Sequence, residues 1–210
     1  MPVDFAALLN AHATLNRGAA QVTLWAQSSH AGEGNGSEGN RGALIRTRMV
    51  GNCLRELDRF LSVCMDETAL HLDASGPLDP AFPRLRNTPN KLRLVEARIG
   101  AMTSRHVRLR AIGRISACLH HCSGHIHDPG LHGDVALAHG AGWDVMPPME
   151  PPRTEMGKLN LTGSTIIRIG AFYREIAEDL LAGVRRATPI IDFSGPTCNL
   201  KAANVACDGI

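Results

Sequence analysis

The chain has 210 residues, of which 44% are hydrophobic and only 4% aromatic, and its formal net charge is +2. This length fits one domain with an aliphatic core, and the shortage of aromatic and β-branched residues argues against a β-sandwich or barrel. No apolar stretch reaches the length that spans a bilayer, and the first residues lack the basic and apolar regions of a secretory signal. Six cysteines without such a signal predict reduced thiols in a cytoplasmic protein.

Two long helices are predicted in the N-terminal third of the chain. Helical spacing of apolar residues predicts the first from Asp4, its N-cap, to about Ser28, and a Gly-rich loop follows over residues 31–42. The second is predicted over Ala43–Leu72. Its apolar stripe consists of Ile45, Met49, Cys53, Leu57, Phe60 and Cys64. The mixed charges of a solvated face lie opposite, at Arg48, Arg55, Asp58 and Arg59.

A proline-rich connector over Gly76–Pro89 precedes the third predicted helix. Thr88 followed by Pro89 is a helix start signal, because the hydroxyl can cap the helix and proline fits its first turn. Gly100 and the Thr103–Ser104 pair favour a break before the next helix. The alternative is one kinked helix from Pro89 to Cys122.

The helix predicted over Arg105–Cys122 is the element around which we expect the chain to be organised. Its apolar positions are Val107, Ala111, Ile115, Cys118 and Cys122, with Ile112 and Leu119 beside them. They cover an arc of about 140°, which predicts a buried side. Arg110, Arg114 and His121 fall together at the edge of this arc. Like charges so placed need an acidic partner, an anionic ligand or solvent.

The sequence of residues 123–159 predicts a long irregular segment with a short helix near Asp134–Ala138. We expect Trp143 to hold part of this segment against the bundle. A last helix is predicted from Thr162 or Ser164 to Ala182, with Gly183 as its stop. We therefore expect an all-α bundle of four to five main helices. Residues 1–183 form one domain, and residues 184–210 form an irregular or partner-gripping tail.

Basic residues are concentrated between Arg84 and Arg114, where nine of them accompany the single acid Glu96. The candidate anion-binding residues are Arg105, Arg108, Arg110 and Arg114. The leading hypothesis is a non-catalytic protein, without a cofactor, that binds an anionic ligand, RNA or a protein partner along this helix edge. We expect a homodimer that forms through an apolar helix face. Alternatively, Glu175, Glu178 and Asp179 of the last helix neutralise the arginines within the fold.

Arg114 and His121 have R-x6-H spacing, and Arg114 with His120 gives R-x5-H. This spacing resembles the R-x4–6-H motif of HEPN domains, which are all-α bundles that often act as ribonucleases. The resemblance implies that Arg114 binds the scissile phosphate and that His121 serves in acid–base chemistry, without metal. It also implies two copies of the motif that meet across a dimer.

A cluster of cysteines and histidines surrounds the end of the Arg105–Cys122 helix. Cys118 and Cys122 share one helix face, and His125 and His127 follow the helix end. Thiolate and imidazole are natural zinc ligands, so these four residues are a third functional hypothesis, a small metal-binding site. The alternative is a pair of buried neutral thiols beside a histidine-rich loop.

Overall fold

The computed structural model describes residues 5–31, 40–73, 78–101, 103–143, 157–159 and 161–187. Within these ranges the chain forms helices and no strand, so the protein is all-α, as predicted. The helices are α1 (Phe5–Ala31), α2 (Asn40–Asp73), α3 (Thr88–Arg98), α4 (Arg105–Cys122), α5 (Gly130–His139) and α6 (Gly163–Ala187), with a 3₁₀ turn at Phe82–Arg84.

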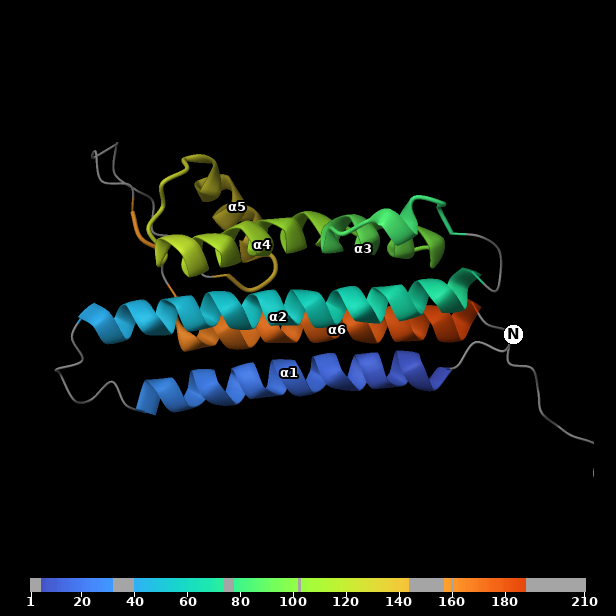
Figure 1. Ribbon diagram of the computed structural model, residues 1–210, viewed down its shortest axis with the longest axis horizontal. Coiled ribbons are helices and arrows are strands. Elements are labelled where there is room, and N and C mark those ends of the chain that lie inside the picture. Colours follow the sequence, from blue (N-terminus) through green and yellow to red (C-terminus); the bar gives the residue numbers. More distant parts are fainter. Residues whose placement is uncertain are drawn as a thin grey trace, which may run out of the picture.

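The long helices α1, α2 and α6 lie side by side, and α3 and α4 lie together along the other side of α2 (Figure 1). α2 packs against α1, α3, α4 and α6, whereas α4 packs against α2, α3 and α5. The centre of the fold is therefore α2, not the Arg105–Cys122 helix favoured by the sequence. Of the helices described, none is long and apolar enough to cross a membrane.

The buried stripe of α2 differs from the predicted one. Leu57 and Cys64 are buried as predicted, but Ile45 and Met49 are 53% and 44% exposed. Steps of four and three residues through Val50, Leu54, Leu57 and Leu61 form the actual stripe. The first turns of α2, which include Ile45, extend past the neighbouring helices (Figure 1), and Ile45 is exposed.

The predicted break between α3 and α4 is confirmed. α3 ends at Arg98, and Gly100 takes a positive φ of 74°, which favours glycine at this turn. The predicted cap is wrong: the side chain of Asn87, not Thr88, accepts from the backbone N–H of Asn90. Thr88 lies inside the first turn, where its hydroxyl donates to Asp58 of α2 instead.

The buried side of α4 agrees with the predicted arc. Ala111, Ile115 and Cys118 are buried, while Val107 and Cys122 at its two ends are half-buried. The short helix predicted near Asp134 is found as α5, and Trp143 just beyond it is buried, as predicted.

Gly183 does not end the last helix, because α6 continues to Ala187. A side chain at Gly183 would place its Cβ 2.7 Å from Cδ1 of Ile99, so this glycine permits α6 to approach the end of α3 closely. Residues 184–187 of the expected tail belong to α6, and residues 188–210 lie outside the described residues.

Candidate functional site

The four arginines predicted as an anion-binding edge each contact a group of the same chain. Arg105 of α4 forms an ion pair with Asp179 of α6, and its Nη2 also lies 3.7 Å from Glu175. Arg108 donates from Nη1 to the carbonyl of Gly140, at 3.2 Å. These contacts fit the alternative in which acids of the last helix neutralise part of the basic block.

Arg110 and Arg114 contact the two neighbours of α4. Arg110 is exposed and donates to Oδ1 of Asn90 at 3.3 Å. Arg114 lies 2.6 Å from Asp128 and 2.7 Å from the buried Asp134 of α5. Burial raises the pKa of Asp134, and the charge of Arg114 opposes this shift. Arg114 therefore compensates a buried carboxylate and fastens α5 to α4.

The two residues of the HEPN-like pair have separate surroundings. Arg114 contacts Asp128 and Asp134, whereas the exposed His121 lies against His120, with ring centroids 4.5 Å apart in an edge-on arrangement. Among the described residues, no hydrogen bond or ring contact joins Arg114 to His121. The structure thus gives Arg114 a role in packing that the resemblance does not imply.

The predicted metal ligands are not gathered around one point. The thiol of Cys118 donates to the carbonyl oxygen of His125 at 3.2 Å, and the exposed His125 and His127 have ring centroids 6.5 Å apart. Burial raises the pKa of Cys118 to about 11, and Cys122 adds to the shift. In the described part of the chain, no three His, Cys, Asp or Glu side chains are arranged to hold a metal ion.

A cationic surface that the sequence did not reveal lies where α2 crosses the end of α4. Gly51 permits the crossing, because a Cβ there would come within 2.7 Å of the backbone nitrogen of His120. We define the α2–α4 cationic face by its four side chains: Arg48, Arg55, His120 and His121. Partial burial lowers the pKa of His120, and the charges of His121, Arg55 and Arg48 lower it further.

A pocket of about 210 Å³ opens next to this face, between α2, α4 and α6. Its lining residues are Leu54, Arg55, Asp58, Arg59, Gly113, Ser116 and Tyr173. Arg55 and Arg59 are exposed and form the rim, whereas Tyr173 of α6 is fully buried. Ser116 fixes the wall, because its hydroxyl donates to the carbonyl of Gly51 at 2.8 Å.

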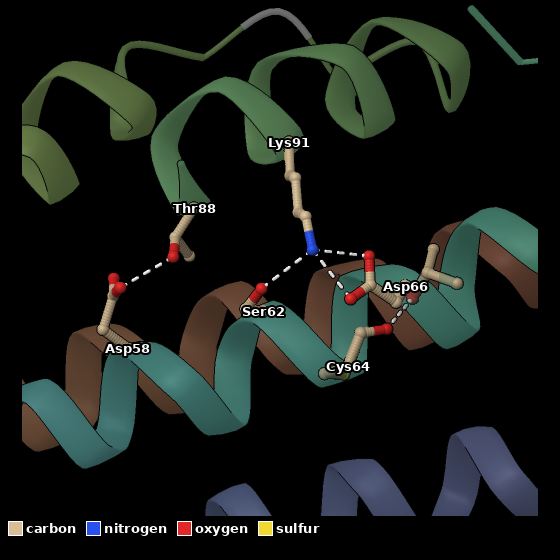
Figure 2. A network of polar contacts seen from close by, with 7 residues as sticks. Asp58, Ser62, Cys64, Asp66, Thr88 and Lys91 are labelled. Atoms are coloured by element: carbon tan, nitrogen blue, oxygen red, sulfur yellow. Dashed lines mark hydrogen bonds and ion pairs between the residues drawn. The ribbon is translucent and has the colours of Figure 1, made fainter. Parts of the chain in front are cut away.

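The carboxylate of Asp58 is held in place from α3. Thr88 donates to its Oδ2 at 2.6 Å, at one end of the polar contacts that join α3 to α2 (Figure 2). Burial raises the pKa of Asp58, and the Thr88 hydrogen bond opposes this shift. Burial also holds the pKa of Tyr173 well above its usual range, and Asp58 adds to that effect. The Tyr173 hydroxyl thus remains a hydrogen-bond donor.

The sequence pattern predicts Arg55, Asp58 and Arg59 on a solvated face, and nothing in it connects them with Gly113 or Tyr173. The sequence signal for this pocket is Gly113. Glycine within a helix costs about 1 kcal/mol of stability relative to alanine, so its presence in α4 indicates a local structural role. Here a Cβ at position 113 would meet no atom within 4 Å, so glycine leaves the pocket open. No family model matches the sequence, and neither curated proteins nor solved structures give a match.

Proposed function

We propose that this is a non-catalytic helical-bundle protein that binds an anionic ligand or partner through the α2–α4 cationic face. The observation that carries the proposal is that Arg48 of α2 reaches the end of α4, next to the His120–His121 pair, where Gly51 lets the two helices approach closely. Basic side chains gathered on one surface attract anions and speed their encounter. Arg105 and Arg114, by contrast, already have carboxylate partners.

Arg48 and Arg55 suit phosphate recognition, because a guanidinium group presents several N–H donors in a planar fork. Arg48 uses Nε to donate to Ser123 at 3.2 Å, which orients its side chain across the α2–α4 junction. His120 and His121 add hydrogen-bonding groups from α4. The proposed setting is the cytoplasm, in keeping with free thiols at the four described cysteines.

A labelled single-stranded RNA serves as the polyanionic probe, with fluorescence anisotropy recorded over a salt series. We expect the double variant Arg48→Gln/Arg55→Gln to bind at least about ten times more weakly and to lower the salt slope by about 1–2. The matched control is Arg86→Gln/Arg93→Gln, which removes the same charge from exposed arginines near α3. Equal losses in both double variants would refute a localised site.

We also propose that two copies associate through the exposed apolar side of α1 and α2. Val63 and Leu70 lie seven residues apart on α2 and are 51% and 55% exposed. Val63 borders a shallow apolar groove that Ala7, Ala11 and Phe60 also line. Light scattering should give a dimer mass for the wild type and a monomer mass for Val63→Lys/Leu70→Lys. A monomeric wild type would contradict this part of the proposal.

A further inference from the structure

We propose that two copies of this chain pack α2 against α2 in opposite directions about a two-fold axis at Val63, so that Arg59 of each copy pairs with Glu67 of the other. This inference rests on the proposed association through the exposed side of α1 and α2. It goes further in naming the direction of the two helices, the residue at the axis and the charges that select a second copy as the partner.

The surface concerned is the apolar groove between α1 and α2, which has a volume of about 310 Å³. On its α1 side Ala7 and Ala11 are small and leave it hollow, and on its α2 side Phe60 and Val63 form the wall. Val63 is 51% exposed, although it borders apolar side chains. An apolar surface edged by charged residues is typical of a protein–protein contact.

Charges of opposite sign lie on either side of Val63. Arg59, four residues before it, has a side chain that is 76% exposed. Glu67, four residues after it, is half-buried and lines the groove. Residues four apart lie on one face of a helix, so Arg59, Val63 and Glu67 form a single ridge along α2. This ridge is basic at one end, apolar in the middle and acidic at the other end.

Glu67 provides the observation that points to a partner outside the chain. In the described part of the molecule its carboxylate forms no hydrogen bond or ion pair, although it lies in an apolar groove. A half-buried carboxylate loses hydration, and a cation brought to it would compensate that loss. Arg59 can supply this cation, because its own contact with Glu56, at 3.2 Å, is an exposed ion pair that contributes little.

A second copy in the reverse direction brings that cation to Glu67. Within one chain Arg59 and Glu67 lie about 12 Å apart along the helix, too far for contact. In an interface with two-fold symmetry, residues equally distant from the axis face each other, so an axis at Val63 places Arg59 of each copy beside Glu67 of the other. Ridges of residues four apart lie side by side in the commonest packing of two helices. Two parallel copies would instead oppose like charges, which selects the antiparallel arrangement.

Charge reversal in two separate variants of the full chain tests the proposal. In Arg59→Glu every contact between the copies joins two acids, and in Glu67→Arg every contact joins two bases. We expect each variant alone to raise the dimer dissociation constant at least about tenfold, because like charges face each other twice. An equimolar mixture should recover the dimer, because both contacts of a mixed pair then join opposite charges. Sedimentation measures the dissociation constants, and native mass spectrometry separates mixed from unmixed dimers by mass.

The matched control is Arg174→Glu, which reverses an exposed arginine on α6, away from the groove between α1 and α2. It should dimerise as the wild type does, and it should not form mixed dimers preferentially with Glu67→Arg. Recovery of the dimer in the mixture of Arg59→Glu and Glu67→Arg also shows that neither variant is unfolded. A dimeric wild type whose two variants give no excess of mixed dimers overturns this arrangement and leaves the association through α1 and α2 standing. A monomeric wild type overturns both.

Discussion

The ammonium nitrogen of Lys91 lies 2.7 Å from both carboxylate oxygens of Asp66, so α3 is joined to α2 by an ion pair (Figure 2). Ser62 accepts a further hydrogen bond from Lys91 at 3.0 Å, and the Phe82 ring centroid lies 6.0 Å from the same nitrogen. The Lys91 side chain is only 10% exposed, whereas that of Asp66 is 47% exposed. Lys91 therefore relies on the ion pair to compensate its buried charge, whereas water can solvate the carboxylate of Asp66.

Removing Asp66 should cost more stability than removing Lys91. Asp66→Ala leaves a buried ammonium group with Ser62 as its main acceptor, whereas Lys91→Met leaves a carboxylate that water can reach. We expect losses of about 2–3 kcal/mol for Asp66→Ala and about 1 kcal/mol for Lys91→Met, because breaking a buried pair strands a charge. Urea unfolding of both single variants and the double variant measures this; equal single losses would contradict the asymmetry.

Two glycine-to-alanine substitutions should act in opposite directions. Gly51→Ala brings a Cβ to 2.7 Å from the backbone nitrogen of His120 and should cost about 1–3 kcal/mol by forcing α2 from α4. Gly113→Ala meets no atom within 4 Å and should stabilise α4 by about 0.5–1 kcal/mol. The free energy of unfolding of each variant, measured by thermal or urea unfolding, tests both expectations. A stabilising Gly51→Ala would refute the close approach of the two helices.

Arg114→Gln should lower stability because it leaves the buried Asp134 without its cationic partner. We expect a loss of about 1–2 kcal/mol, limited by the partial exposure of Arg114. A second substitution, Asp134→Asn, should recover part of that loss. An HEPN-like ribonuclease predicts a different result: both Arg114→Gln and His121→Ala would abolish RNA cleavage, and Asp134→Asn would restore none of it.

Glu96 should make stability fall as the pH rises. Burial raises its pKa from an ordinary 4.5, while a hydrogen bond from Thr103 and the charges of Arg105 and His106 lower it. The folded state therefore holds this proton more tightly than the unfolded state, and its contribution is lost as the pH rises from 4.5 through the raised pKa. Glu96→Gln keeps an acceptor for Thr103 without a charge.

Urea midpoints at pH 5 and pH 8 for the wild type and Glu96→Gln isolate this effect, since other raised carboxyl groups such as Asp58 are common to both proteins. The wild type should lose more stability than the variant between the two conditions. The same pH dependence in both proteins would show that Glu96 does not titrate in this window.

The thiols of Cys64 and Cys118 should react slowly in the folded protein. Burial raises the pKa of Cys64 to about 12 and that of Cys118 to about 11, so at pH 8 the reactive thiolate is a very small fraction. Labelling with iodoacetamide followed by peptide mass spectrometry should show both residues modified at least about ten times faster in urea. Rapid modification of Cys118 without denaturant would contradict its described burial.

The helices could be predicted because their signals are local. Apolar spacing located α4 and α6, and Gly100 identified the break before α4, since each depends only on neighbouring residues. The misplaced stripe at Ile45 and Met49 shows the limit of such signals. Which apolar positions are buried depends on where the other helices end, and one sequence does not contain that information.

The pocket between α2, α4 and α6 could not be predicted from the sequence either, because it depends on tertiary packing. Asp58, Gly113 and Tyr173 belong to three different helices, and only their tertiary packing brings them to one pocket. The acidic partners of Arg105 could be predicted as a class, because the polar side of α6 carries Glu175 and Asp179. The partners of Arg114 could not, since Asp128 and Asp134 lie in a segment with little helical periodicity.

The packing of α1 against α6 has a consequence for biosynthesis. α1 is translated well before α6, which is one of the two long helices that bury its apolar side. Until α6 emerges, Leu15 and Ala19 of the nascent chain remain partly uncovered and open to aggregation. Chaperone demand should therefore persist until α6 has been made, and ribosome pausing before residue 163 should prolong it.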